Sequence, residues 1–202
     1  YAGGTWAFLG DGADTKRLHP GRSSEAGVAS AYLARSGLTG PRSILDAPWG
    51  GYFSPFCGDA ATPERTVEAL GREFRIMNTG IKLHACCRGL HSPVEALQGL
   101  LREHGLRARD IRRIVVHGAE RTVRQFSKRD VRTTLDGQFS LPYALAVVAI
   151  DGRAGLDQFV PLREDAATRA MIDRVEVRAD RALGPYDEPD IEVELVSGAV
   201  LA

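Results

Sequence analysis

The sequence has few lysines and cysteines and no long apolar run. No stretch of eighteen apolar residues occurs among its 202 residues, so no membrane-spanning helix is predicted. The first residues, Tyr1 to Gly4, have neither the basic segment nor the apolar core of a secretory signal peptide, and the chain does not start with Met. We therefore expect no signal peptide here and a true N-terminus elsewhere. The three cysteines, two of them adjacent, give no disulfide pattern, which favours a reducing, cytoplasmic location.

Charge excludes another class of partner. The 26 basic and 26 acidic residues cancel, whereas a nucleic-acid-binding domain usually has a basic surplus. The basic residues are mostly arginine, and only Lys16, Lys82 and Lys128 are lysines. The pKa of a lysine shifts readily on burial, and proton-transfer chemistry can use that shift. With 44% hydrophobic and 26% charged residues the composition is that of a globular chain. Because arginine is the usual surface cation of this chain, each of the few lysines is a candidate for a defined role.

The first third of the chain predicts helices joined by a loop. Residues 23–36 are rich in small side chains and predict a helix that Ser23 or Ser24 caps and Gly37 ends. Small side chains let a helix approach its neighbours closely, so we expect this helix to be buried. Residues 41–61 are rich in glycine, proline and aromatic residues, and they predict a connecting loop.

Two further helices have recognisable starts. Thr62-Pro63-Glu64 places proline at the first position and an acid in the first turn of a predicted helix. A second helix is predicted over residues 92–104, where Ser92 and Glu95 have the spacing of a capping box and Pro93 takes the first position. Its apolar residues recur at helical spacing, so one face should be buried.

The remainder mixes strands with helices. Residues 111–117 (IRRIVVH) predict a strand, and residues 191–195 alternate apolar and acidic side chains as a half-buried strand does. A hairpin turn at Ser197-Gly198 should return the chain through Val200 and Leu201. Helical spacing also recurs from Phe139 to Ile150. Because strands appear only in this part, we place a domain boundary near residues 73–80.

Two clusters combine lysine, arginine and histidine directly before predicted helices. The first runs from Lys16 to Arg22 (KRLHPGR), and the second runs from Lys82 to His91 (KLHACCRGLH). A helix N-terminus attracts anions through its free N–H groups and its dipole. The repeated pattern indicates a small polyanionic ligand. The alternative is that both clusters are solvated surface charges, as most lysines and arginines are.

A metal centre is the other chemistry that these clusters suggest. His84, Cys86, Cys87 and His91 are all metal-ligand types, but adjacent cysteines lack the spacing of structural zinc sites. Cys57 lies outside any Cys-x-x-Cys pattern, so an iron–sulfur cluster is a poor match. We therefore expect no metal, and interpret Cys86 and Cys87 as ordinary buried thiols.

Tyr143 has two interpretations that composition does not separate. Its helical spacing with Phe139 and Val147 is typical of an aromatic residue in a core. A phenol at this position could instead reach a carboxylate of a bound substrate.

Three blocks of the sequence together resemble successive blocks of the MmgE/PrpD family. They occur in the same order as in that family and cover essentially the whole chain: GDGADTKRLHPGRSSEAGVASAYLARSGLTGP, IKLHACCRGLHSPVEAL and GQFSLPYALAVVAIDG. The resemblance implies an α+β chain, with residues 1–75 forming the end of an all-helical domain and residues 76–202 a smaller α+β lid domain. It also implies that a full member is about twice this length and usually forms a homodimer.

The resemblance further implies an enzyme that needs no cofactor. The family includes 2-methylcitrate dehydratases, cis-aconitate decarboxylases and an iminodisuccinate epimerase, all of which act next to a carboxylate of a small polycarboxylic acid. A carbon–oxygen lyase similar to 2-methylcitrate dehydratase is the main expectation here. An epimerase or decarboxylase of a related acid, or a non-catalytic acid-binding fragment, are the alternatives.

Matching the family's motifs residue by residue gives the expected site. Lys16 matches the lysine of a TK-x-L-H-x-G block, Lys82 that of an IK block, and Tyr143 the tyrosine of an FS-x-x-Y block. His91 matches the histidine just before the next helix and is the expected base. The residues expected to bind substrate are Arg22, His19 and Arg88.

Overall fold

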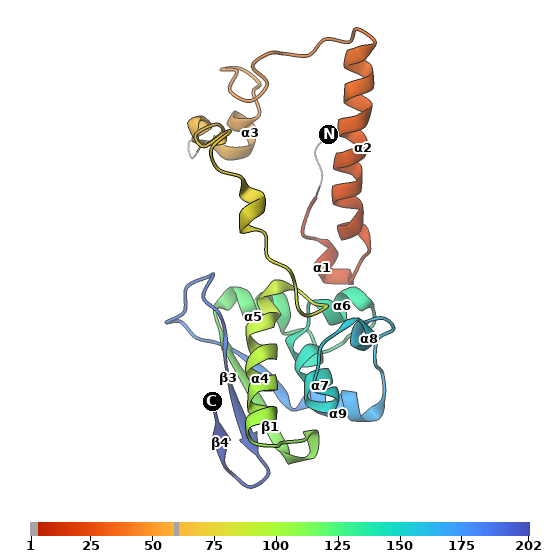
Figure 1. Ribbon diagram of the computed structural model, residues 1–202, viewed down its shortest axis with the longest axis vertical. Coiled ribbons are helices and arrows are strands. Elements are labelled where there is room, and N and C mark those ends of the chain that lie inside the picture. The colour runs from red at the N-terminus through yellow and green to blue at the C-terminus, as the bar shows by residue number, and fades with distance from the viewer. Residues whose placement is uncertain (1–3, 59–60) are drawn as a thin grey trace. The chain divides into compact units, whose positions relative to one another are not determined.

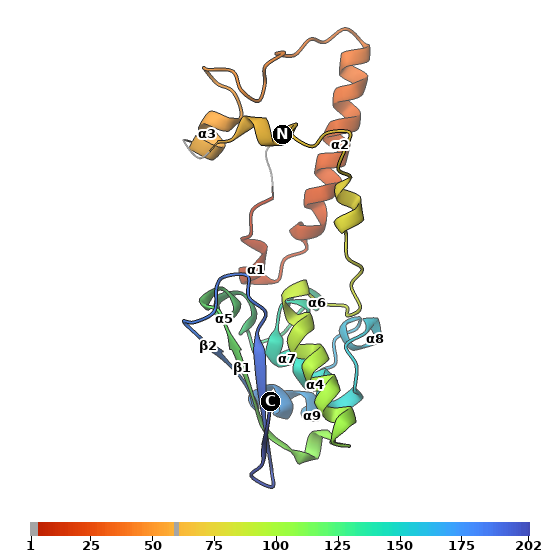
Figure 2. The same cartoon turned by 60° about the vertical axis from the view of Figure 1, so that its left-hand side comes forward.

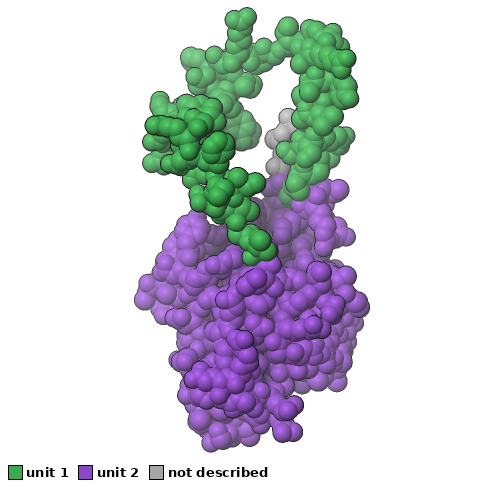
Figure 3. Space-filling model, in the orientation of Figure 1, with its two compact units in different colours: residues 1–3, 19–81 green, residues 4–18, 82–202 purple. Residues whose placement is uncertain are grey.

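A computed structural model describes residues 4–58 and 61–202. Within these residues, contacts divide the chain into two compact units, which Figure 3 shows in different colours. We call His19–Ile81 unit 1, and Gly4–Leu18 together with Lys82–Ala202 unit 2. Helices come first and a mixed sheet with its covering helices follows, so the expected α+β class is confirmed.

Unit 2 is built on a four-stranded mixed sheet with the order β2-β1-β3-β4. The central strand β1 (Ile111–Gly118) pairs in parallel with β2 (Val175–Ala179) and antiparallel with β3 (Asp190–Leu195). The hairpin strand β4 (Val200–Leu201) pairs with β3. In β3 the apolar side chains of Ile191 and Val193 are buried, which confirms the predicted half-buried strand.

Helices of unit 2 bury the apolar surface of the sheet (Figures 1 and 2). Helix α4 (His91–Glu103) packs on β3, helix α7 (Leu141–Asp151) packs on β2, and both pack on each other. Residues 141–149 of α7 are all buried, which explains why this helix is apolar on every side. The shorter helices are α1 (Phe8–Asp11), α5 (Glu120–Phe126), α6 (Thr134–Gln138), α8 (Leu156–Phe159) and α9 (Ala166–Asp173).

The predicted start of α4 is wrong in detail. A single 3₁₀ turn (Arg88–Leu90) leads directly into the helix, so α4 begins at His91 and Ser92 lies inside it rather than capping it. The capping box with Glu95 therefore does not form, and the carboxylate of Glu95 lies beside the ring of His84 instead. The apolar face of α4, formed by Val94, Leu97 and Leu101, is buried as the spacing predicts.

The described residues of unit 1 contain helices and turns without a strand. Helix α2 (Thr15–Arg35), whose first turn belongs to unit 2, is the longest; α3 (Phe53–Cys57) and the 3₁₀ turns Pro63–Thr66 and Arg75–Asn78 follow. No described helix combines the length and apolar character that crossing a bilayer requires.

Three expectations for unit 1 are wrong. Helix α2 begins at Thr15 rather than at Ser23, because Asp14 supplies a carboxylate at its positive end and Pro20 removes only one backbone donor from the ladder. None of its residues is buried, since its small side chains find no packing layer within this unit. The helix expected to open at Thr62 is only a 3₁₀ turn, and the Thr62 side chain does not cap it.

Candidate active site

Lys16 and Lys82 line one cavity of about 540 Å³ in unit 2. The other residues that line it are apolar or uncharged apart from a histidine: Leu83, His84, Ala85, Cys86, Cys87, Gln138, Phe139, Gly155 and Leu156. No aspartate or glutamate of the described residues lines this cavity. Two ammonium groups without a protein carboxylate make it a site for an anion. We call it the lysine cavity.

The corner between α1 and α2 holds Lys16 in place. Phe8 of α1 is buried against the ring of Phe139. Gly12 turns the chain with a φ of 63°, and its carbonyl accepts a hydrogen bond from Thr133 Oγ1 at 3.3 Å. This anchors the start of α2 to unit 2, so Lys16 enters the cavity from a backbone with defined contacts.

The third lysine completes that anchor. Lys128 Nζ donates to Asp136 Oδ1 at 2.6 Å and to the carbonyl of Gly10 at 3.5 Å. Asp136 is buried and also accepts from the backbone N–H groups of Arg132 and Thr133. Burial by itself would raise the pKa of Asp136, but the Lys128 hydrogen bond and the two backbone donors hold it below its ordinary value. Lys128 is thus a structural residue, and it lines no part of the lysine cavity.

The electrostatic state of Lys16 reflects its surroundings. Its Nζ atom lies over the ring of Phe139, 4.7 Å from the ring centre. Burial lowers the pKa of Lys16, and the positive charge of Lys82 lowers it further. A bound carboxylate would oppose both of these effects on the Lys16 pKa, because its negative charge stabilises the poorly solvated ammonium group.

Backbone hydrogen bonds fix the segment that carries Lys82. The N–H of Ala85 donates to the carbonyl of Ala154 at 3.0 Å, and the N–H of Cys87 donates to the carbonyl of Gln138 at 2.8 Å. Lys82 Nζ itself donates to the carbonyl of Cys86 at 3.1 Å. Segments that are distant in sequence therefore meet around the cavity with satisfied backbone groups.

The structure places the expected base, His91, behind the cavity. His91 is 5% exposed and does not line the lysine cavity, and its ring packs edge-on against His84 with 4.9 Å between ring centres. Burial lowers the pKa of His91, and His84 lowers it further. His84 lines the cavity in its place. In extended chain, residues two apart share a face, so the Lys82-x-His84 spacing was the signal that could have identified His84.

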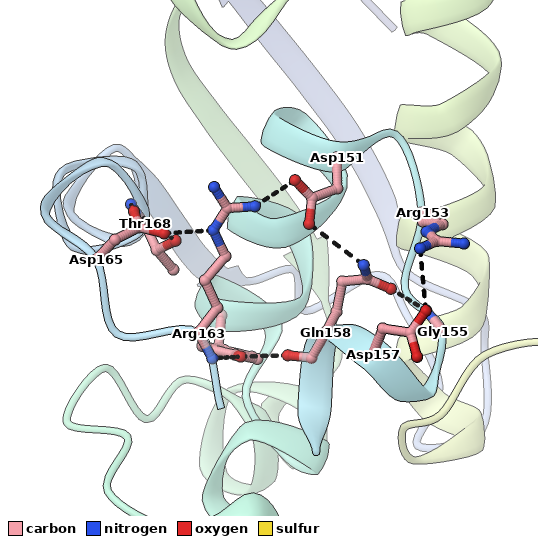
Figure 4. Close-up of polar contacts among 9 residues, drawn as sticks. Asp151, Arg153, Gly155, Asp157, Gln158, Arg163, Asp165 and Thr168 are labelled. Atoms are coloured by element: carbon pink, nitrogen blue, oxygen red, sulfur yellow. Dashed lines mark hydrogen bonds and ion pairs between the residues drawn. The ribbon is translucent and has the colours of Figure 1, made fainter. Parts of the chain in front are cut away.

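Tyr143 is not brought to the lysine cavity. It is 1% exposed, and its hydroxyl donates to the carbonyl of Gln158 and accepts from the N–H of Arg163 at 2.8 Å. Burial raises the pKa of Tyr143. The Arg163 guanidinium pairs with Asp151 and Asp165 beside it (Figure 4). These contacts make Tyr143 an anchor of the turn after α8, on the rim of a second cavity of about 490 Å³.

The residues expected to bind substrate do not line the lysine cavity. Arg88 is exposed and forms a two-pronged contact with Glu188, with nitrogen–oxygen distances of 2.9 and 3.4 Å. His19 and Arg22 lie on α2 in unit 1, where Arg22 is exposed and pairs with Glu25. Their roles in binding stay predictions.

The cysteines do not gather into a metal site. Burial raises the pKa of Cys86 to about 12, with Cys87 adding to the effect, so Cys86 is an inert thiol. Among residues 4–58 and 61–202, no group of three or more His, Cys, Asp and Glu side chains is placed to hold a metal ion. The expected metal-free chemistry stays a prediction that a chelator can test.

Comparison with known proteins places the chain in a family. A sequence profile of the MmgE/PrpD C-terminal domain matches residues 84–200, and one of the N-terminal domain matches residues 1–64. The cis-aconitate decarboxylase-like protein oryM of Aspergillus oryzae is 33% identical over 187 residues, which are 86% of this chain and 39% of that protein. A cis-aconitate decarboxylase of Aspergillus terreus is 28% identical over 161 residues, which are 73% of this chain and 33% of that protein.

The chain thus spans about two-fifths or less of the length of these curated relatives. The C-terminal profile alone covers more than half of the chain. The residues that line the cavity fall within it apart from Lys16, Lys82 and Leu83. The chain belongs to the MmgE/PrpD family.

Proposed function

We propose that the lysine cavity binds a small polycarboxylate and that the complete protein is a lyase that breaks a bond next to one of its carboxylates. The observation that carries this proposal is the meeting of Lys16 and Lys82 in one cavity whose described lining has no acidic side chain. Neither ammonium group has a carboxylate partner in the cavity, so an anionic ligand supplies the missing charge.

The proposed reaction is decarboxylation of cis-aconitate or a closely similar tricarboxylate. The relatives described above carry that activity in their names, which supports this choice over other members of the family. Elimination of water from a 2-methylcitrate-like acid is the second candidate, supported by the same cavity chemistry.

Both reactions develop negative charge on carbon beside a carboxylate. When carbon dioxide leaves, the electron pair of the broken carbon–carbon bond stays on the substrate, and a neighbouring carboxylate spreads the charge. Fixed cations stabilise such a charge most where water is excluded. Lys16 is partly desolvated over the Phe139 ring, and Lys82 is oriented by the Cys86 carbonyl, so both ammonium groups are preorganised for this role.

The test uses the complete gene product, because this chain covers only part of its relatives. The protein is mixed with cis-aconitate or with 2-methylcitrate in the presence of chelator, and both carbon dioxide release and the organic product are followed by NMR. Lys16→Met and Lys82→Met keep the length of each side chain and remove its charge. Arg109→Met removes an exposed cation outside the cavity and serves as the matched control.

We expect carbon dioxide release from cis-aconitate, a loss of about 10²- to 10³-fold in kcat for each lysine variant, and no change for the control. Water loss from 2-methylcitrate without decarboxylation would select the second candidate. Full activity of both lysine variants, with normal melting curves, would refute the site. Activity that chelator abolishes and zinc or iron restores would refute metal-free chemistry.

A further inference from the structure

We infer that His84, oriented by Glu95, is the catalytic residue that carries the proton in the lysine cavity. This inference rests on the proposed function and assigns a residue to its second requirement, a proton donor. Carbon that keeps an electron pair after losing carbon dioxide must receive a proton, and histidine is the side chain best suited to give one near neutral pH.

Position separates His84 from the other histidine of this segment. His84 lines the lysine cavity together with Lys16 and Lys82, whereas His91 lies in the core behind it and does not line the cavity. The two rings pack edge-on with 4.9 Å between their centres. His91 therefore packs against the His84 ring, and of these two histidines His84 is the one that lines the cavity.

Glu95 defines which ring nitrogen of His84 faces the ligand. The side chain of His84 is 10% exposed, and its Nε2 atom lies 3.6 Å from Oε1 of Glu95. Nε2 is buried and has no hydrogen-bond partner among the described residues. A small rotation of the half-exposed Glu95 side chain closes this gap, which would leave Nδ1 as the nitrogen that meets the substrate.

Charged groups of both signs surround His84. Its ring lies beside the Glu95 carboxylate and the His91 ring, and Lys82 and Lys16 line the same cavity. The two lysines can hold carboxylates of a bound polycarboxylate in the cavity that His84 also lines. His84 can then reach the carbon next to one of those carboxylates.

The step needs only the substrate and one proton, which solvent supplies in the end. The bond between carbon and the departing carboxylate breaks, carbon dioxide leaves, and its electron pair remains on the substrate carbon. Nδ1–H of the imidazolium then gives its proton to that carbon and forms the new carbon–hydrogen bond. The neutral ring takes a proton from water after the product leaves. Glu95 touches no substrate in this scheme and is a positioning residue.

The experiment compares four forms of the complete protein: unaltered, His84→Ala, His91→Gln and Glu95→Gln. For His84→Ala we expect kcat to fall about 10²- to 10³-fold, KM to change less than threefold, and added imidazole to restore part of the rate. Rescue is the decisive readout, because a merely structural histidine would not be replaced by free imidazole.

The two other variants separate positioning from packing. Glu95→Gln should lower kcat about tenfold without moving KM or the melting temperature. His91→Gln should lower the melting temperature, because it changes a buried side chain, while kcat stays within about tenfold of the unaltered protein. If His84→Ala itself melts early, His84→Gln keeps a polar side chain there and should show the same loss of kcat.

Particular outcomes would overturn the inference. If His84→Ala is active, another residue is the proton donor. The same conclusion follows if imidazole does not rescue an inactive His84→Ala protein while His91→Gln loses kcat at a normal melting temperature. Absence of turnover in the unaltered protein refutes the proposed function, and this inference with it. That result is distinguishable, since only then is every form inactive.

Discussion

Unit 1 and unit 2 differ in whether they bury their own apolar side chains. Among the described residues, every buried hydrophobic side chain belongs to unit 2, from Phe8 to Val193. Unit 1 instead leaves large apolar side chains uncovered, including Trp49 at 93%, Met77 at 82% and Ile81 at 92% exposed. Burying such area contributes roughly 25 cal/mol per Å², so unit 1 forgoes the main stabilisation that unit 2 has.

Whether a unit buries its own apolar side chains decides whether it can hold a binding site of fixed geometry. The lysine cavity is lined by residues of unit 2 alone, whose backbone is held by a sheet, packed helices and the Lys128–Asp136 pair. A site needs fixed geometry before substrate arrives, and only a packed unit supplies it. His19 and Arg22, the predicted ligands on unit 1, lie on α2, which has no buried residue among those that the structure describes.

The strongest test of this comparison is a matched pair of phenylalanines. Phe159 of unit 2 is 0% exposed and packs on Tyr143, whereas Phe74 of unit 1 is 67% exposed. Phe159→Ala should lower the free energy of unfolding by about 3–5 kcal/mol, through lost burial and the cavity left behind. Phe74→Ala should change it by less than about 0.5 kcal/mol. Urea unfolding of the chain measures both.

Equal losses for the two variants would break the comparison, because they would mean that Phe74 is covered in solution. The same two variants can be compared in this chain and in the complete gene product. A change in the unfolding free energy of Phe74→Ala between the two proteins would show how far other segments cover unit 1.

The sequence predicted the elements of unit 2 better than those of unit 1. The alternation in residues 191–195 and the apolar face of α4 were both confirmed, since each pattern reports burial against a core that unit 2 contains. The helix over 23–36 was predicted as buried from its small side chains. Composition shows only that a helix can pack closely, and it does not show whether a neighbour is present.

The sequence placed Lys16 and Lys82 in two separate clusters, and the structure brings both to one cavity, while their roles stay predictions. The meeting of Lys16 and Lys82 depends on the Gly12 turn and on the Lys128–Asp136 pair, contacts between segments that no local pattern encodes. The sequence included His84 in the second cluster and among possible metal ligands, but gave it no role in proton transfer. The predicted capping box paired Glu95 with Ser92, whereas Glu95 lies beside His84, because the 3₁₀ turn Arg88–Leu90 leads into a helix whose first residue is His91 rather than Pro93.

A glycine in each unit gives a second comparison of unit 2 with unit 1, with an intermediate loss of unfolding free energy expected. Gly12 and Gly37 both have positive φ, at 63° and 100°, so alanine is strained at either. At Gly12 a Cβ atom would also lie 2.6 Å from Oδ1 of Asp136 and from Oγ1 of Thr133, while at Gly37 nothing lies within 4 Å. Gly12→Ala should cost about 2–4 kcal/mol, combining backbone strain with overpacking. Gly37→Ala should cost about 1–2 kcal/mol.

Melting curves and unfolding free energies of the two glycine variants provide the measurement. In the complete protein, Gly12→Ala should also lower turnover, because the turn at Gly12 leads into the residues that carry Lys16. A Gly12→Ala protein as stable as Gly37→Ala would show that the corner between α1 and α2 is loose, and that Lys16 is not held as described.

The last comparison is between two ion pairs, one in each unit, and it depends on pH. Because the folded-state pKa of Asp136 is held below its ordinary value, its stabilisation is present above about pH 4 and is lost as pH falls through the folded-state pKa. Asp136→Asn should therefore cost about 1–3 kcal/mol at pH 7, because the half-buried Lys128 loses its buried carboxylate partner, and the cost should shrink in acid. Glu25→Gln breaks the exposed pair with Arg22 in unit 1 and should cost less than about 1 kcal/mol.

Unfolding free energies measured from pH 3 to pH 7 give both curves. A cost for Asp136→Asn that stays constant with pH would mean that the carboxylate does not titrate with folding, and that Lys128 holds the Gly10 carbonyl without it.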